Sequence, residues 1–202
     1  MKVTGTLVIC LWLVMAIAAR ADMDPILDTS GQPLSRGVEY LIKPAIANDG
    51  GNFTLVDRNG SCPYYVGQED ANSTGGIPVT FSPYMEDETV VMETRNFKID
   101  FSGNLTCNQS TTWKIGDNDT MTESRLIVTG DNSTLQNYFY VHTGPEVLLN
   151  GSYGLRWCPS QLCPYCRFDC GYINVLIENG TRLLYLNDTS AFPIVFERLN
   201  IL

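Results

Sequence analysis

The sequence has almost no histidine and no recognisable phosphate-binding loop, and both absences limit what it can do. His142 is the only histidine among 202 residues, so a site with two histidine ligands cannot form, and a Ser-His-Asp triad would have to be built around this residue. It follows Tyr138–Val141, where a strand-end or surface histidine is the simpler interpretation. Gly50-Gly51 and Gly75-Gly76 are typical of turns. We therefore expect a protein that is not an enzyme and that needs no metal or cofactor.

Basic residues are also scarce. The chain has 13 Lys and Arg against 22 Asp and Glu, a formal charge of −9, and the basic residues form no cluster. Phosphate backbones and anionic membranes are held by clustered positive charge. The composition therefore predicts that neither nucleic acid nor a membrane is a partner. The length suits one domain with a proper core.

The first 21 residues are typical of a secretory signal peptide. Lys2 supplies the positive start, Leu7–Ala19 the apolar core, and Ala19-Arg20-Ala21 a small-residue cleavage site. The other interpretation, a membrane anchor, would need an apolar run of about 20 residues. We expect cleavage after Ala21 and a secreted chain of residues 22–202, in the extracellular space or in the vacuole.

Asparagine usage agrees with secretion. Ten asparagines lie in the N-x-S/T motif for N-glycosylation, far more than ordinary turn asparagines would explain, and a glycan requires a surface position. The predicted glycosylation sites are Asn52, Asn59, Asn72, Asn104, Asn108, Asn118, Asn132, Asn150, Asn179 and Asn187.

Six cysteines remain once Cys10 leaves with the signal peptide. Two stand far apart, and four cluster with the spacing C-x4-C-x2-C-x3-C, which could hold zinc or an iron–sulfur centre. The stretch Cys163-Pro164-Tyr165-Cys166 also looks like a thioredoxin-type redox pair. A secreted chain argues against the metal sites, and the strand-and-turn surroundings argue against the redox site. Structural disulfides are the favoured interpretation.

Short apolar or alternating runs recur every 10 to 15 residues, separated by Gly, Asn, Asp, Ser and Pro, and there is no long helical period. This pattern predicts an all-β chain that closes into a barrel or a sandwich, with a hairpin turn at Asn179-Gly180. The expected strands are Tyr40–Ile42, Phe53–Val56, Tyr64–Val66, Ile77–Phe81, Thr89–Met92, Phe97–Phe101, Thr112–Ile115, Arg125–Thr129, Tyr138–Val141, Gly154–Trp157, Ile173–Ile177, Arg182–Leu186 and Ile194–Phe196.

The order of several motifs resembles the plant Kunitz-type (soybean trypsin inhibitor) family. The opening stretch Ile26–Leu34, followed by Tyr40-Leu41-Ile42, is similar to the start of these inhibitors, and the likeness continues along essentially the whole mature chain. The four-cysteine cluster resembles the miraculin-like branch. The further matching segments are Gly50–Leu55, Ser61–Pro63, Gly76–Val79, Ser110–Lys114, Tyr138-Phe139, Leu155–Pro159, Cys170-Gly171 and Arg182–Leu184.

The resemblance implies a β-trefoil: twelve strands, six closing a barrel and six capping it, with pseudo-threefold symmetry. It implies three disulfides, Cys62–Cys107, Cys158–Cys170 and a small inner ring Cys163–Cys166. Trp113 and Trp157 lie in motifs of the family's core, so we expect them to be buried. Most members are monomers, so we expect a monomer.

The resemblance also implies a protease inhibitor that inserts a substrate-like loop into its target. The loop would comprise Ser82, Pro83, Tyr84, Met85, Glu86 and Asp87, with Met85 filling the specificity pocket. Met85 replaces the Arg or Lys of trypsin-directed members, so an apolar pocket of a serine endopeptidase is the expected target rather than trypsin. Some members act on cysteine proteases through other surfaces.

A second departure concerns the support of this loop. Arg36 stands where the family has a loop-supporting asparagine, and we expect it to pair with the acidic residues that follow Met85. If the loop is idle, the other interpretation is a non-inhibitory, miraculin-like glycoprotein for defence, storage or ligand binding.

Overall fold

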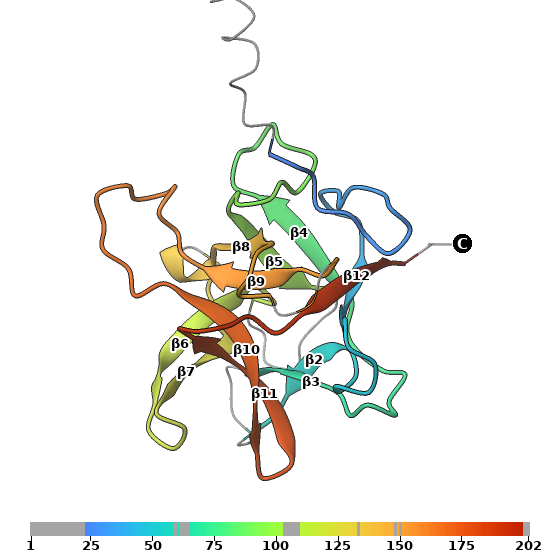
Figure 1. Ribbon diagram of the computed structural model, residues 1–202. Coiled ribbons are helices and arrows are strands. Elements are labelled where there is room, and N and C mark those ends of the chain that lie inside the picture. The colour runs from blue at the N-terminus through green and yellow to red at the C-terminus, as the bar shows by residue number, and fades with distance from the viewer. Residues whose placement is uncertain are drawn as a thin grey trace, which may run out of the picture.

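The computed structural model describes residues 23–58, 60, 65–102, 110–132, 134–147, 149 and 151–199. Within them the chain forms twelve strands and one short 3₁₀ helix (Figure 1). In chain order these are β1 (Tyr40–Pro44), β2 (Phe53–Val56), β3 (Tyr65–Gln68), β4 (Val79–Pro83), β5 (Phe97–Phe101), β6 (Trp113–Asp119), β7 (Ser124–Thr129), η1 (Leu135–Asn137), β8 (Phe139–His142), β9 (Gly154–Trp157), β10 (Gly171–Glu178), β11 (Thr181–Asn187) and β12 (Ile194–Arg198).

Six strands form a barrel. They pair antiparallel in the order β12, β1, β4, β5, β8, β9. A bridge between Tyr153, just before β9, and Ile194, the first residue of β12, joins the two ends of this row. Closure leaves no open edge in the barrel, which removes the surface on which strands of other chains could add.

The other six strands form three hairpins, β2–β3, β6–β7 and β10–β11. They meet one another at one end of the barrel, because β3 pairs with β7 and β11, and β11 pairs with β7 (Figure 1). Gly67 of β3 lies where two hairpins touch: a Cβ there would be 2.4 Å from the carbonyl oxygen of Arg182. Three four-strand units around one axis confirm the predicted β-trefoil.

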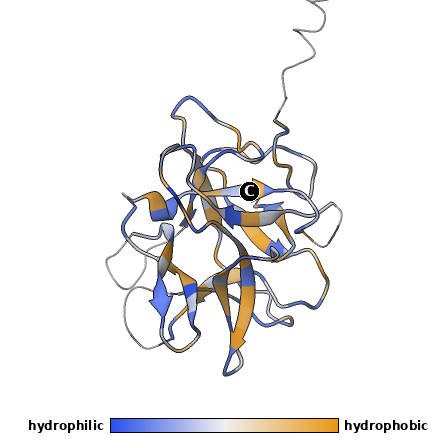
Figure 2. Cartoon of the chain, turned by 60° about the vertical axis from the view of Figure 1, so that its left-hand side comes forward, coloured by the Kyte–Doolittle hydropathy of each residue, from blue (hydrophilic) through white to orange (hydrophobic). Residues whose placement is uncertain are grey.

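The main hydrophobic core fills the barrel and its contact with the hairpins. Phe81 lies at its centre and meets the rings of Phe97 and Phe196 edge-on, with ring centroids 5.4 and 5.5 Å apart. Trp113 and Trp157 are both buried, as predicted. Figure 2 shows hydrophobic stretches on the strands, while the connecting loops carry much of the hydrophilic colour. Burial of each large side chain contributes about 1.5 to 3 kcal/mol, which makes this core the main stabilising feature.

Twelve of the expected strands are present, and one prediction was wrong. Thr89–Met92 is not a strand: Val90 and Met92 each make a single bridge to the N-terminal segment, at Ser35 and Pro25. That segment folds back on itself, so it offers isolated residues and not a continuous strand to pair with. The Asn179-Gly180 hairpin is confirmed, with both residues at positive φ between β10 and β11.

Two of the predicted disulfides are confirmed, Cys158–Cys170 and Cys163–Cys166. Both close the segment between β9 and β10, and the inner ring lies within the outer one. The pair Cys62 and Cys107 and the predicted signal peptide lie outside the described residues, so those two predictions stay predictions.

Asp28 fastens the N-terminal segment to β12. Its side chain is fully buried, and Arg198 Nε donates to it over 2.7 Å. Ser30 donates through both its amide and its hydroxyl, and the amide of Gln32 donates as well. Burial alone would raise the pKa of Asp28, but these hydrogen bonds outweigh it and lower the pKa from 3.8 to about 2.

We expect Asp28 to account for a loss of about 2 kcal/mol of stability as the pH falls from about 4 to 2. The folded pKa lies below the unfolded one, so the contribution of the Asp28 carboxylate is complete above 3.8 and disappears as pH falls through about 2. Urea unfolding at a series of pH values measures this. Asp28→Asn, which has no charge to lose, should be less stable at pH 7 and show a flatter profile in this window. An unchanged profile in Asp28→Asn would contradict the prediction.

Candidate functional site

The predicted loop leaves the barrel at the end of β4. Side chains alternate along a strand, so Phe81 and Pro83 point into the core while Ser82 is only partly covered. Beyond Pro83 the chain leaves the sheet, and Tyr84 and Met85 are 43% and 44% exposed. Glu86 and Asp87 are exposed beside them. The loop forms part of the green segment at the top of Figure 1, between β4 and β5.

Arg36 contacts this loop directly, as predicted, but through a different set of atoms. Its Nη2 donates to the carbonyl oxygens of Pro83 (3.0 Å) and Met85 (2.9 Å), and its Nε donates to the carbonyl oxygen of Glu88 (3.0 Å). The expected pairing with loop carboxylates was wrong for Glu88, whose carboxylate lies 2.9 Å from Arg95 Nη1. Backbone carbonyls bind the guanidinium because its forked donors reach several of them at once.

Further backbone hydrogen bonds fix the ends of the loop. The amide of Tyr84 donates to the carbonyl of Asn96 (2.9 Å), and the amide of Arg36 donates to the carbonyl of Thr89 (2.8 Å). Within the loop the amide of Glu88 donates to the carbonyl of Met85 (3.2 Å), which closes a turn over residues 85–88. These hydrogen bonds define the closed turn seen in this structure, with the Met85 side chain at its surface.

Asn96 supports the loop from the core, and sequence reasoning missed it. It is 1% exposed, and its Nδ2 lies 3.4 Å from the carbonyl oxygens of Phe139 and Cys158. The backbone amide of Asn96 donates to Gln161 Oε1 (3.0 Å), so Asn96 also anchors the segment that the two disulfides close. One feature of the sequence could have indicated this role. Asn96 is among the few asparagines outside glycosylation motifs, so a structural role for its side-chain amide was the remaining interpretation.

A recess of about 280 Å³ lies under the loop. Its lining comprises Tyr84, Met85, Glu88, Arg95, Asn96 and Gln161. Tyr84 also packs against Tyr138, whose ring meets it edge-on with centroids 5.6 Å apart. The exposed residues Tyr84 and Met85 are therefore supported by packed and hydrogen-bonded neighbours.

Comparison with known proteins shows which family has this architecture. The family model described as "Trypsin and protease inhibitor" (Kunitz legume) matches residues 26–198. The chain belongs to the Kunitz legume inhibitor family. Kunitz type trypsin inhibitor 104 of Medicago truncatula is 39% identical over 192 residues, which is 93% of this chain and 92% of the relative. Miraculin of Synsepalum dulcificum is 30% identical over 89% of this chain and 84% of its own length.

Among solved structures, the Kunitz-type cysteine protease inhibitor PCPI-3 from potato matches with a TM-score of 0.72. It is 29% identical, and the alignment covers 88% of this chain and 98% of the potato protein. The relatives named here include a trypsin inhibitor and a cysteine protease inhibitor by name, so membership in the family leaves the protease class of this member open.

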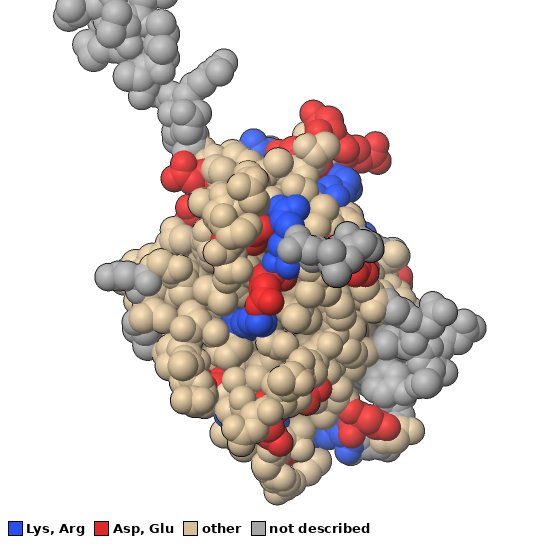
Figure 3. Space-filling model, turned by 90° about the vertical axis from the view of Figure 1, so that its right-hand side faces the viewer, with Lys and Arg blue, Asp and Glu red and all other residues tan. Residues whose placement is uncertain are grey.

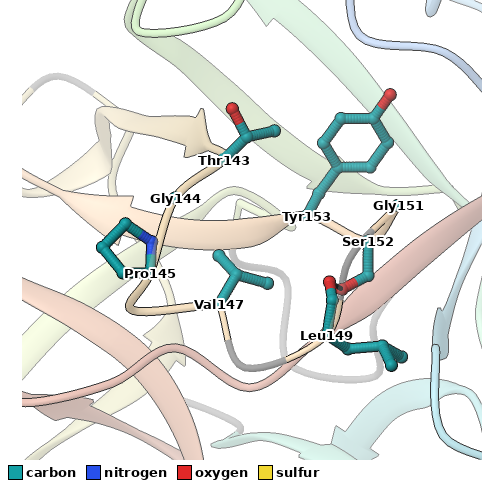
Figure 4. A pocket seen from close by; sticks show the side chains of 8 residues that line it. All are labelled: Thr143, Gly144, Pro145, Val147, Leu149, Gly151, Ser152 and Tyr153. Atoms are coloured by element: carbon teal, nitrogen blue, oxygen red, sulfur yellow. Dashed lines mark hydrogen bonds between the residues drawn. The ribbon is translucent and has the colours of Figure 1, made fainter.

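Another surface depression of this Kunitz chain lies in the connection from β8 to β9 (Figure 4). It measures about 510 Å³, and its three hydroxyl groups already have partners. Thr143 donates to Glu93, Ser152 donates to the carbonyl of Leu149 (2.7 Å), and Tyr153 accepts from the amide of Leu27 (3.1 Å). These hydroxyl groups stabilise the fold through their hydrogen bonds, so the depression is a weaker candidate for the functional site than the loop.

His142 ends β8, as expected, and its Nε2 lies 3.0 Å from Glu146 Oε2. A backbone hydrogen bond within Glu146 and the His142 side chain lower the pKa of this glutamate. Among the described residues no group of three or more His, Cys, Asp or Glu side chains could hold a metal ion. No helix in the described part of the chain is long and apolar enough to cross a membrane.

Charged side chains of both signs stand side by side on the face shown in Figure 3. Three of the basic residues are in ion pairs at the barrel and the loop: Lys43 with Glu197, Arg198 with Asp28, and Arg95 with Glu88. Each of these three positive charges therefore has an acidic neighbour.

The predicted glycosylation sites differ in their exposure. Asn72, Asn118, Asn132 and Asn179 are exposed, and Asn187 is partly exposed. Asn52 is only 9% exposed, and its Nδ2 donates to the carbonyl of Gly75 (2.5 Å). A glycan replaces one of the two Nδ2 hydrogens and needs open space around this nitrogen, so burial of Asn52 argues against its glycosylation in the folded chain. The remaining predicted sites, Asn59, Asn104, Asn108 and Asn150, lie outside the described residues.

Proposed function

We propose that this chain inhibits a serine endopeptidase with an apolar specificity pocket, and that Ser82–Asp87 is the inhibitory loop. The observation that carries the proposal is the exposed Met85 side chain on a loop whose two ends are fixed by backbone hydrogen bonds to Asn96 and Arg36. In this role Met85 fills the pocket of the protease, and Tyr84 contributes a second exposed contact.

Rigidity is the property that distinguishes an inhibitor from a substrate. A loop held at its ends by the barrel and by backbone hydrogen bonds to Asn96 and Arg36 loses little conformational entropy on binding, and these ends stay in place if the protease attacks the peptide bond after Met85. The unbranched methionine suits an apolar pocket, whereas a trypsin pocket presents a carboxylate that methionine cannot pair with.

We also propose that this inhibitor is secreted. Two disulfides in the segment between β9 and β10 support an oxidising environment, and so a secreted inhibitor that meets secreted proteases. Cysteine proteases are the second class to test, because the potato relative carries that activity in its name.

We expect Met85→Ala to weaken inhibition roughly hundredfold, because truncation removes the residue that fills the pocket. The measurement is residual activity of chymotrypsin, elastase, subtilisin, trypsin and papain titrated with the oxidised, glycosylated protein. Met121→Ala is the matched control, since Met121 is 71% exposed on a different turn.

Equal inhibition by both variants would place the contact elsewhere. Inhibition of papain alone, unaffected by either substitution, would move the site to another surface. No inhibition of any of the five proteases would favour a non-inhibitory role for this family member.

A further inference from the structure

The carbonyl oxygen of Met85 is fully occupied by donors from its own chain. Arg36 Nη2 donates to it over 2.9 Å, and the amide of Glu88 donates to it over 3.2 Å. A carbonyl oxygen has two lone pairs, so no further strong donor can be accommodated there.

A serine protease needs that same atom. It holds the carbonyl oxygen of the bond it attacks with preorganised donors of its oxyanion hole, and these donors use the same lone pairs. With Met85 in the specificity pocket, its carbonyl oxygen must therefore exchange Arg36 and Glu88 for the donors of the protease. The closed turn and the docked loop exclude each other at this atom.

We propose that Arg36 is a latch that keeps the inhibitory loop in a closed, non-docking turn, and that a protease captures the state in which the latch is released. This inference rests on the proposed function of the loop. Binding to a state that is only partly populated lowers the apparent affinity by the populated fraction. Arg36 thus limits how strongly the chain inhibits its target.

The geometry explains why Arg36 can act in this way. Nη2 joins the carbonyls of Pro83 and Met85, Nε binds the carbonyl of Glu88, and the backbone amide of Arg36 holds Thr89. One side chain therefore ties both arms of the turn together. It is also exposed, so water competes for each hydrogen bond and the latch can open.

Asparagine at this position is too short to span the three carbonyls, so Arg36→Asn should release the turn. We expect Arg36→Asn to bind the target protease faster and to lower the inhibition constant by about tenfold. Arg36→Lys keeps the positive charge but lacks the fork of donors, and should gain part of the same effect. The gain should disappear in Arg36→Asn/Met85→Ala, because the latch acts through the Met85 bond.

The test uses stopped-flow association and titration with chymotrypsin and subtilisin, beside hydrogen exchange of the Glu88 amide. In the wild type this amide should be protected, and in Arg36→Asn it should exchange faster. Equal or weaker inhibition by a normally folded Arg36→Asn would overturn the latch, as would an unchanged Glu88 exchange rate. If Arg36→Asn should not fold, Arg36→Lys gives the same comparison.

The two proposals fail in different ways. A wild type that inhibits through Met85, with no gain in Arg36→Asn, overturns the latch and leaves the proposed function standing. A wild type and an Arg36→Asn variant that both fail to inhibit any protease overturn both. Inhibition that appears only in Arg36→Asn supports both, with a latch that is almost always closed.

Discussion

Replacing Met85 with arginine is expected to create a trypsin inhibitor, with a gain in trypsin affinity of at least roughly hundredfold over the wild type. The physical reason is charge pairing. The trypsin pocket ends in a carboxylate, and a guanidinium donates two parallel hydrogen bonds to it. This bidentate pair is strong once both groups are removed from water. Methionine offers nothing to that carboxylate, while the backbone support of the loop is the same in both proteins.

The measurement is the inhibition constant for trypsin in stoichiometric titrations. Met121→Arg is the matched control, since it makes the same change of charge on an exposed methionine of another turn. If Met121→Arg inhibits equally well, the effect is one of net charge and the loop assignment fails. If Met85→Arg is cut by trypsin without slowing it, the loop is too loose to inhibit.

Replacing Arg58 with methionine is expected to destabilise the fold by about 3 to 5 kcal/mol, the usual cost of leaving buried charge unpaired. Arg58 follows β2, and its side chain is only 7% exposed. It donates to Asp119 at the end of β6 (2.6 Å) and to Glu178 at the end of β10 (2.5 Å). Each of the three residues belongs to a different hairpin, so this cluster joins the three hairpins of the trefoil.

The pKa values of Arg58 and Asp119 depend on each other. The hydrogen bonds that Arg58 donates to Glu178 and Asp119 raise the pKa of Arg58, and Arg58 in turn lowers the pKa of Asp119. Tyr65 of β3 adds a ring 5.3 Å from the guanidinium carbon. Removing the one cation therefore leaves two carboxylates facing each other in a largely buried place, which explains the large expected loss.

Urea unfolding with the disulfides intact measures the effect of Arg58→Met. Arg58→Met/Asp119→Asn/Glu178→Gln should recover part of the loss, because no charge is then left without a partner. Lys43→Met is the surface control: Lys43 and Glu197 are 32% and 42% exposed, so that change should cost less than about 1 kcal/mol. A loss in Arg58→Met no larger than in Lys43→Met would contradict the prediction.

The strands could be predicted because short alternating runs separated by turn residues leave few other folds open. Phe53–Val56 and Phe97–Phe101 were predicted with the bounds that the structure gives. Thr89–Met92 has the same composition but no strand beside it, and pairing depends on a partner that local sequence does not reveal. The loop and the two disulfide pairs came from resemblance to a family, not from periodicity.

What the sequence determined by itself is the all-β character and the hairpin at Asn179-Gly180, because each depends on local pattern. Only the tertiary structure decided which polar atoms meet. Arg58 is 61 residues from Asp119 and 120 from Glu178, and Arg36 is 49 residues from the Met85 carbonyl that it occupies. Hydrogen bonds act over about 3 Å and require defined angles, so such contacts exist only after the barrel has brought distant segments together.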